Sequence, residues 1–177
     1  MRILGVDPGT IVTGFGIVEY NNNRLVRIKS GVIIPDKKQD MAIRLSVIYD
    51  ELDKIIKIYK PDQFSIETAF YGKNIQSAMK IGYARGVSLL AAVHNKLTYA
   101  EYSPREVKKA IVGKGAASKE QVQFMIRKLM FIKEGKMKFD ESDGLAIAAC
   151  HAFRLNSFVS KGGNWKKFVE ANPERIL

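Results

Sequence analysis

Ile3-Leu4-Gly5-Val6-Asp7-Pro8-Gly9-Thr10 is the stretch of sequence that decides the fold. Its apolar run predicts a short buried strand, and Pro8-Gly9 turns the chain directly after the carboxylate of Asp7. A carboxylate at the end of an apolar strand is costly unless a cation or hydrogen-bond donors neutralise it. Because Gly5 and Gly9 carry no side chains, we expect a ligand to approach the backbone beside Asp7. The alternative is an Asp-Pro-Gly turn without chemistry.

The composition is that of a globular chain with a strong positive charge. The 177 residues include 29 basic and 18 acidic side chains, which give a formal net charge of +11. The basic excess is five in residues 1–100 and six in residues 101–177, so it is spread through the chain. A basic folded surface favours a polyanionic partner, most often nucleic acid, although it also serves solubility alone.

Several features predict one cytoplasmic domain without a membrane anchor. No apolar run approaches the roughly 20 residues of a membrane span, and no basic and apolar leader precedes the first strand. The single cysteine, Cys150, excludes an internal disulfide and fits a reducing compartment. We expect one domain over residues 1–158 and a C-terminal tail, residues 159–177, that Trp165 and Phe168 partly order.

Hydrophobic periodicity predicts an α/β fold. Strands are expected near residues 3–7, 13–20, 24–34, 63–67 and 97–102. Helical spacing and capping signatures predict helices near residues 40–59, 74–95, 104–113, 118–130 and 140–158. This order indicates a mixed β-sheet of five strands flanked by helices, in which the first three strands form an antiparallel meander.

Four carboxylates are expected at the ends of these elements. Glu67 ends the fourth strand as Asp7 ends the first, so parallel neighbouring strands would place both at one edge of the sheet. Asp140 and Asp143 are three residues apart at a helix start and share one face. Taken singly, Asp140 is explained as an N-cap and Asp143 as a favourable charge in the first turn.

Taken together, the four carboxylates favour a metal-dependent reaction. Clustered carboxylates repel each other, and sites made of oxygen ligands suit Mg²⁺ or Mn²⁺. Two such ions about 3.5–4 Å apart can activate a water molecule and stabilise the leaving oxygen of a phosphodiester. That chemistry matches a basic chain with a nucleic-acid partner.

In these motifs the chain resembles RuvC, the bacterial Holliday-junction resolvase family, over about residues 1–155. The matching motifs are Gly5-Val6-Asp7-Pro8-Gly9-Thr10, Ile66-Glu67, Lys73-Asn74, Gly82-Tyr83-Ala84-Arg85-Gly86, Val107-Lys108, Val112-Gly113, Ser118-Lys119 and residues 140–148, from Asp140 to Ala148. The resemblance implies an RNase H-like fold and a homodimer. It also implies an endodeoxyribonuclease that resolves four-way junctions by Mg²⁺-dependent symmetric nicking of two strands of like polarity, in DNA recombination and repair.

The resemblance also assigns roles to residues and partners. By position, Asp7, Glu67, Asp140 and Asp143 match the family's catalytic carboxylates and would hold two Mg²⁺ ions, for which Mn²⁺ can substitute. The implied partners are four-way junction DNA, a second copy of the chain and the RuvA-RuvB branch-migration complex. Residues after about 158 have no counterpart in this resemblance.

Five further residues are predicted to contact DNA: Phe70, Tyr71, Lys73, Lys108 and Lys119. The two aromatic residues follow a catalytic carboxylate in a loop, where they can wedge between bases or stack on them; covering a helix end is the alternative. Lys108 and Lys119 match DNA-binding positions of the family. Lys119 also lies in the first turn of a helix, where backbone N–H groups favour phosphate. Lys73 and Lys80 are further candidates for phosphate contacts; the alternative is that they are merely solvated, as many exposed lysines are.

Small residues recur at four-residue spacing on the helix expected over residues 74–95. Ala78, Gly82 and Gly86 form this series, although a glycine inside a helix costs about 1 kcal/mol relative to alanine. We therefore expect another element to approach this helix closely. It is either the chain's own sheet or the partner helix of a dimer.

Three other functions fit part of the pattern. An actin-like ATPase also has an Asp-x-Gly-Thr turn on its first strand, but it needs a second lobe with a further phosphate-binding hairpin. A DNA-binding module without catalysis would use the acidic residues only as helix caps. A nuclease that cuts RNA in a hybrid duplex would share the fold.

Overall fold

The computed structural model describes residues 1–22, 24–68, 75–133, 135 and 137–161. In these ranges one sheet contains five strands in the order β3-β2-β1-β4-β5. The strands are β1 (Arg2–Asp7), β2 (Thr13–Asn21), β3 (Arg24–Ile33), β4 (Gln63–Glu67) and β5 (Thr98–Tyr102). The helices are α1 (Met41–Tyr59), α2 (Ile75–His94), α3 (Pro104–Val112), α4 (Lys119–Leu129) and α5 (Phe139–Lys161).

The sheet is mixed, as the sequence predicts. β1 pairs antiparallel with β2, and β2 pairs antiparallel with β3, which confirms the expected meander. β4 lies parallel to β1 on its other side, and β5 lies parallel to β4. Parallel neighbours need a crossover connection, which α1 provides before β4 and α2 provides before β5. The carboxyl ends of β1, β4 and β5 therefore meet at one edge of the sheet.

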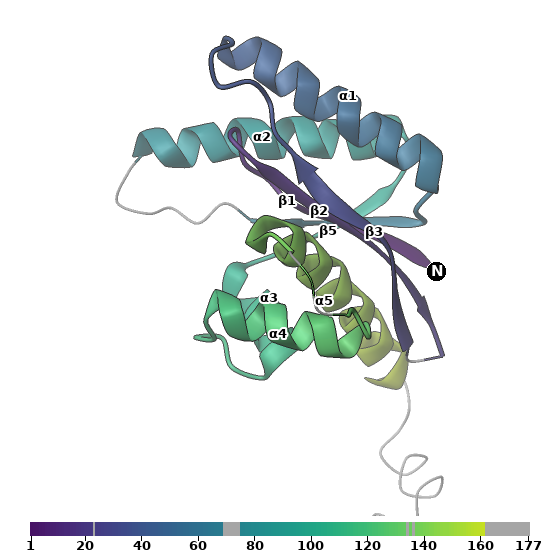
Figure 1. Ribbon diagram of the computed structural model, residues 1–177. Coiled ribbons are helices and arrows are strands. Elements are labelled where there is room, and N and C mark those ends of the chain that lie inside the picture. The colour runs from purple at the N-terminus through teal and green to yellow at the C-terminus, as the bar shows by residue number, and fades with distance from the viewer. Residues whose placement is uncertain (23, 69–74, 134, 136, 162–177) are drawn as a thin grey trace, which may run out of the picture.

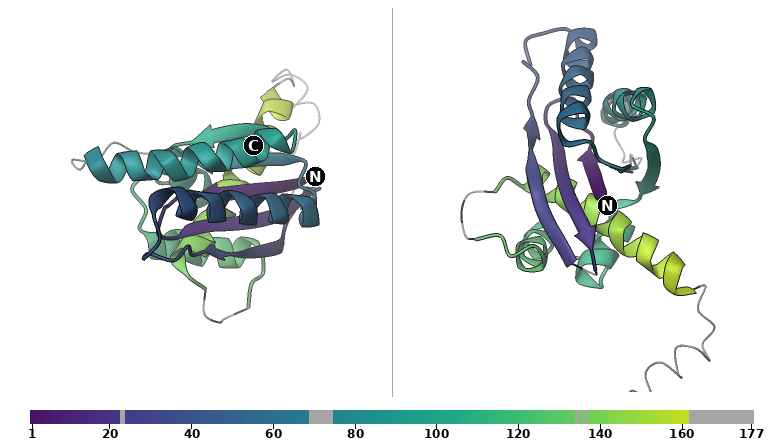
Figure 2. Two further views of the ribbon diagram at one scale, coloured as in Figure 1. Left: turned by 90° about the horizontal axis from the view of Figure 1, so that it is seen from above. Right: turned by 90° about the vertical axis from the view of Figure 1, so that its right-hand side faces the viewer.

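Helices cover both faces of the sheet. α1 and α2 lie on one face, and α3, α4 and α5 lie on the other (Figure 1). Seen from above, α1 and α2 run side by side across the sheet (Figure 2). Successive side chains of a strand point to opposite faces, so the core consists of two clusters, one on each face of the sheet. Leu4 and Val6 pack with Ile48 of α1, whereas Ile3 packs with Leu145 and Ile147 of α5.

α5 lies with its backbone directly against β1 and β2. A Cβ added at Gly5 would lie 2.3 Å from the carbonyl oxygen of Gly144, and one at Gly14 would lie 1.9 Å from that of Asp140. The expectation that Gly5 leaves room for a ligand is therefore wrong, because α5 fills that space. A Cβ at Gly9 would likewise lie 2.3 Å from the carbonyl oxygen of Val12. These close approaches hold the N-terminal turn of α5 over the ends of β1 and β2.

The helix boundaries confirm most of the capping signatures and correct one. Ser103 and Ser118 each form the predicted capping box at the start of α3 and α4. α5 begins at Phe139, so Asp140 lies inside its first turn and is not the N-cap. The same helix continues to Lys161, three residues beyond the predicted end. No helix in the described ranges is long and apolar enough to cross a membrane.

Candidate active site

Three of the four predicted carboxylates line one cavity at the carboxyl edge of the sheet. Val6 of β1 and Ile66 of β4 are partners in the parallel register, so Asp7 and Glu67 follow as the next residues of two adjacent strands. Asp143 reaches the same cavity, of about 210 Å³, from the second turn of α5. Three segments that are far apart in the sequence therefore bring their acidic side chains to one place.

Asp140, the fourth carboxylate, lies beside this cavity and lines a different one. That second cavity, of about 360 Å³, is also bordered by Thr10 and by Ser77 and Lys80 of α2. The charge of Asp140 nevertheless raises the pKa of Asp7. The two aspartates of α5 thus act on Asp7 from neighbouring positions.

Burial and mutual repulsion raise the pKa values of these acids. Burial, together with the charges of Asp143 and Asp140, raises the pKa of Asp7 to about 6. Burial and the charges of Asp7 and Asp143 raise the pKa of Glu67 to about 8. The pKa of Asp143 is also raised by burial, although its hydrogen bond with Lys119 opposes the shift. The protein alone therefore supplies too little positive charge to keep the cluster ionised.

Lys119 is the cation that pairs directly with this cluster among the described residues. Its Nζ donates a hydrogen bond to Oδ2 of Asp143 at 2.9 Å from the first turn of α4. Burial alone would lower the pKa of Lys119, but the hydrogen bond and the charges of Asp143, Asp7 and Asp140 raise it. The sequence predicts a phosphate contact for this residue, whereas the structure pairs it with a carboxylate. Lys108 also lines the cavity, from α3.

The side chains of the cavity have the right chemistry for a hard divalent cation. The acidic donors are all carboxylate oxygens, and ligands of this type suit Mg²⁺ or Mn²⁺. Within the described ranges, however, no three His, Cys, Asp or Glu side chains lie close enough together to hold a metal ion. Oδ2 of Asp143 accepts the hydrogen bond of Lys119, so a cation would have to compete with this ammonium for that oxygen. The donor set therefore fits a hard cation in its chemistry, but the described side chains do not converge on one point.

Arg44 of α1 is a residue of the site that the periodicity does not reveal. Its position suggests an exposed side chain, yet its guanidinium donates a hydrogen bond to the carbonyl oxygen of Thr10. The hydroxyl of Thr13 donates to the carbonyl oxygen of Gly9 at 2.7 Å. Together these bonds fix the turn that follows Asp7. The contact joins residues 34 apart in the sequence, so no local pattern could have predicted it.

The predicted aromatic loop, the cysteine and one histidine are placed as follows. Phe70, Tyr71 and Lys73 lie outside the described residues. Cys150 is buried in α5, and burial raises the pKa of its thiol to about 12. His151 is buried and bonded to the hydroxyl of Tyr102 at 2.7 Å, and burial lowers its pKa.

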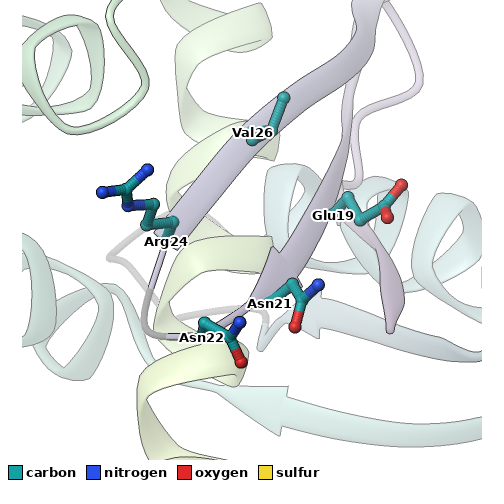
Figure 3. Close-up of a pocket in the computed structure, with 5 residues that line it drawn as sticks. All are labelled: Glu19, Asn21, Asn22, Arg24 and Val26. Atoms are coloured by element: carbon teal, nitrogen blue, oxygen red, sulfur yellow. The ribbon is translucent and has the colours of Figure 1, made fainter.

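A larger hollow, of about 600 Å³, lies at the β2–β3 hairpin, remote from the carboxylates (Figure 3). Its lining consists of Glu19, Asn21, Asn22, Arg24 and Val26. Glu19 and Arg24 point to opposite sides of the hairpin (Figure 3), and Glu19 forms an ion pair with Arg2 at 3.4 Å. Because its polar groups do not converge, this hollow is a poor candidate for catalysis.

Comparison with known proteins identifies the family that shares this arrangement. The family model described as crossover junction endodeoxyribonuclease RuvC matches residues 3–151. The RuvC of Chloroherpeton thalassium is 44% identical, over all of both chains. The RuvC of Geobacter sulfurreducens is 45% identical, over 91% of this chain and 96% of its own.

Solved structures show the same fold. The T. thermophilus RuvC in complex with a Holliday junction substrate superposes with a TM-score of 0.82 at 29% identity. The match covers 88% of this chain and 94% of that one. The yeast mitochondrial Holliday junction resolvase Ydc2 superposes with a TM-score of 0.62 at 13% identity, which shows likeness of fold alone. The five-stranded mixed sheet with its flanking helices is thus an RNase H-like fold, as the sequence predicts.

Proposed function

The chain belongs to the crossover junction endodeoxyribonuclease RuvC family, and from that premise we propose that it resolves four-way Holliday junctions by nicking two strands of like polarity. One observation carries the proposal: Asp7, Glu67 and Asp143 share a cavity with Lys108 and Lys119. Acidic side chains that can hold cations thus adjoin basic side chains that can hold phosphate. A site of this kind suits phosphodiester hydrolysis.

We propose that Asp7, Glu67, Asp140 and Asp143 are the catalytic carboxylates and hold Mg²⁺, with Mn²⁺ as a substitute. Two bound cations would lower the pKa of an attacking water and stabilise the leaving oxygen. The raised pKa values of Asp7 and Glu67 support this assignment, because such acids gain most from nearby positive charge. The turn held by Arg44 keeps Asp7 in place at the end of its strand.

Lys108 and Lys119 are proposed to bind the phosphates that flank the cut. In the free protein Lys119 is paired with Asp143. Its ammonium would therefore lie next to a phosphate that binds at the carboxylates. If a bound cation neutralises the charge of Asp143, Lys119 becomes free to contact DNA. Its place in the first turn of α4 adds exposed N–H groups that favour an anion. Phe70, Tyr71 and Lys73 complete the proposed DNA contacts.

A homodimer is proposed from the outer face of α2. Five large apolar residues of this helix are exposed: Ile75, Met79, Tyr83, Leu90 and Val93. At 100° per residue they fall, together with Gly82 and Gly86, within an arc of about 100°. A Cβ added at either glycine meets nothing within 4 Å, so packing of these glycines on the chain's own sheet is excluded. A partner helix would explain both the glycines and the exposed stripe.

The proposed dimer would match the symmetry of a four-way junction. Two-fold symmetry presents two identical sites to two strands of like polarity, which symmetric resolution requires. The net charge of +11 supports binding to the four arms of a junction. Cooperation with a RuvA-RuvB complex stays a prediction from the family resemblance, and a cytoplasmic location stays a prediction from the sequence composition.

A nicking assay on a synthetic four-way junction tests this function. The wild-type chain should cut two opposed strands in Mg²⁺ and leave linear duplexes and DNA–RNA hybrids intact. Asp7→Asn should bind the junction with unchanged affinity and cut it below the detection limit. Asp50→Asn, on the exposed side of α1, is the matched control and should cut normally.

The same assay separates the alternatives. Cutting of the hybrid in preference to the junction would indicate an RNA-directed nuclease. Binding without any Mg²⁺-dependent cutting by the wild-type chain would indicate a DNA-binding module. Retained cutting by Asp7→Asn would refute the assignment of the catalytic carboxylates.

A further inference from the structure

Phe131, just after the end of α4, is unusual both in its exposure and in its backbone conformation. Its side chain is 90% exposed, and its backbone has a φ of 51°, in the left-handed region that bulky residues avoid. Backbone bonds from Ile132 to Arg127 and from Phe131 to Lys128 form the helix-ending motif in which glycine usually takes this position. An exposed aromatic residue held in an unfavourable conformation suggests a binding role.

Phe131 borders an apolar groove beside α4 and α5, which lie on the same side of the sheet as α3 (Figure 1). The groove has a volume of about 360 Å³ and is lined by Arg24, Leu25, Leu129, Phe131 and Phe153. These residues come from the start of β3, the end of α4 and the C-terminal half of α5. Lys161 ends α5 only eight residues after Phe153, which is about 12 Å along the helix axis.

We propose that the C-terminal segment, residues 162–177, folds back and docks in this groove through Trp165 and Phe168. The segment has 16 residues and can span about 50 Å when extended, so it reaches the groove easily. Trp165, Phe168 and Val169 have the spacing of one apolar helix face. Aromatic side chains bury about 150–250 Å² each, which suits a groove lined by two phenylalanines. Arg24 lines the groove, and the segment carries the opposite charges Glu170 and Glu174.

The position and size of the groove favour this occupant over a second copy of the chain. The stripe proposed for dimerisation is on α2, which covers the opposite face of the sheet (Figure 1). A stable interface between two proteins buries about 800 Å² on each partner, whereas five residues line this groove. One or two aromatic side chains from a nearby segment would fill it.

Tryptophan fluorescence tests the proposal directly, because Trp165 is the chain's only tryptophan. In the full chain its emission should be shifted to shorter wavelength than in a synthetic peptide of residues 158–177. Quenching by acrylamide should also be weaker in the full chain than in the peptide. Phe131→Ser, at an exposed position that the fold does not need, should return both signals to the values of the peptide.

Control variants keep the test specific. Phe124→Ser removes another exposed phenylalanine of α4, which does not line the groove, and should leave the emission unchanged. Phe168→Ser should release Trp165 as Phe131→Ser does. Circular dichroism should confirm that each variant is folded, as expected for Phe131→Ser from the exposure of Phe131.

Four outcomes would overturn the proposal. The first is emission from the wild-type chain that equals that of the peptide. The second is protection that Phe131→Ser does not change, which would place the segment elsewhere. The third is protection that disappears on dilution, which would indicate the groove of a second copy. The fourth is protection that arises only with junction DNA, which would make the segment a DNA contact.

Discussion

Asp7 and Glu67 show how single side chains acquire unusual properties from their surroundings. Each follows a buried strand, and the parallel register of β1 and β4 makes them neighbours. Burial and mutual repulsion raise their pKa values to about 6 and about 8 from ordinary values of 3.8 and 4.5. In the absence of cations, the folded protein therefore holds protons that the unfolded chain releases.

This difference predicts that the metal-free protein loses stability as the pH rises. The folded-state pKa values are raised, so the stabilisation is complete below about pH 4 and is lost as the pH passes through about 6 and about 8. We expect a loss of several kcal/mol at most, since one pKa unit corresponds to about 1.4 kcal/mol and bound water and counterions screen part of the shift. Thermal unfolding in a chelating buffer measures this loss. The measurements should run from about pH 5 to about pH 9, a range that includes the raised pKa values of Asp7 and Glu67.

Glu67→Gln should flatten this pH dependence because the amide does not titrate. Glu51→Gln, on α1 and paired with Lys54, should keep the wild-type profile. Addition of Mg²⁺ should stabilise the wild-type protein more at high than at low pH. A wild-type profile as flat as that of Glu67→Gln would contradict the electrostatic description of the cluster.

Lys119 provides a second test at the residue scale. Lys119→Met keeps most of the apolar stem but removes the charge that faces Asp143. We expect weaker junction binding, with the slope of log affinity against log salt smaller in magnitude by about one, and a larger loss of cutting than of binding. Filter binding at several salt concentrations and single-turnover cutting measure the two effects.

Lys114→Met is the matched control for Lys119→Met, because Lys114 is exposed in the loop after α3 and does not line the cavity. It should leave the cutting rate unchanged. If both variants cut at the wild-type rate, Lys119 has no role in the reaction.

α5 is the element that assembles the site. It contacts β1 and β2 through glycines, and its first two turns carry Asp140 and Asp143. Small residues follow on its inner face, and Ala146, Ala148 and Ala149 are fully buried. Close packing of this kind fixes the direction of the helix, and so it fixes the acidic side chains relative to Asp7.

Gly5→Ala should therefore damage both stability and catalysis. Its Cβ would lie 2.3 Å from a backbone oxygen of α5, and a backbone atom cannot move aside as a side-chain end can. We expect destabilisation of about 1–3 kcal/mol and a fall in the cutting rate because the carboxylates shift. Thermal unfolding and single-turnover cutting provide the measurements.

Gly135→Ala is the control for Gly5→Ala, since its Cβ would meet nothing within 4 Å. Stability within about 0.5 kcal/mol of the wild type is expected there, as for most surface substitutions. Wild-type stability of Gly5→Ala would show that α5 can move away from the sheet without cost.

At the scale of the whole molecule, the helices on the two faces of the sheet form different surfaces. The face with α3, α4 and α5 forms the walls of the carboxylate cavity. The face with α1 and α2 exposes the apolar stripe of α2. A dimer formed through that stripe would couple two cavities without blocking either.

Leu90→Glu should convert the proposed dimer to a folded monomer. A buried carboxylate at the centre of an interface is unfavourable, whereas Leu90 is exposed in the single chain. Sedimentation analysis should show half the mass, and a plasmid cruciform should be nicked in one strand at a time. Ile58→Glu, on the exposed side of α1, is the control. A Leu90→Glu variant that stays dimeric would exclude this interface.

The fold and the candidate site were largely predictable because their signals are local. Apolar runs bounded by turn residues marked the strands, capping boxes marked the starts of α3 and α4, and the order of the elements indicated a mixed sheet. The acidic residues at the ends of β1 and β4 were recognisable for the same reason, since a carboxylate after an apolar run stands out in the sequence. The match of motifs to one family then supplied the reaction.

The sequence by itself therefore determined the elements, the family and the identity of the acidic residues. Only the tertiary structure decided that Gly5 makes room for a helix and not for a ligand, and that Lys119 pairs with Asp143. It also decided that Arg44 holds the turn after Asp7 and that the glycines of α2 face outward. The physical reason is the same in each case. These contacts join residues of separate elements, and their partners are set by how the helices pack on the sheet, which no local pattern encodes.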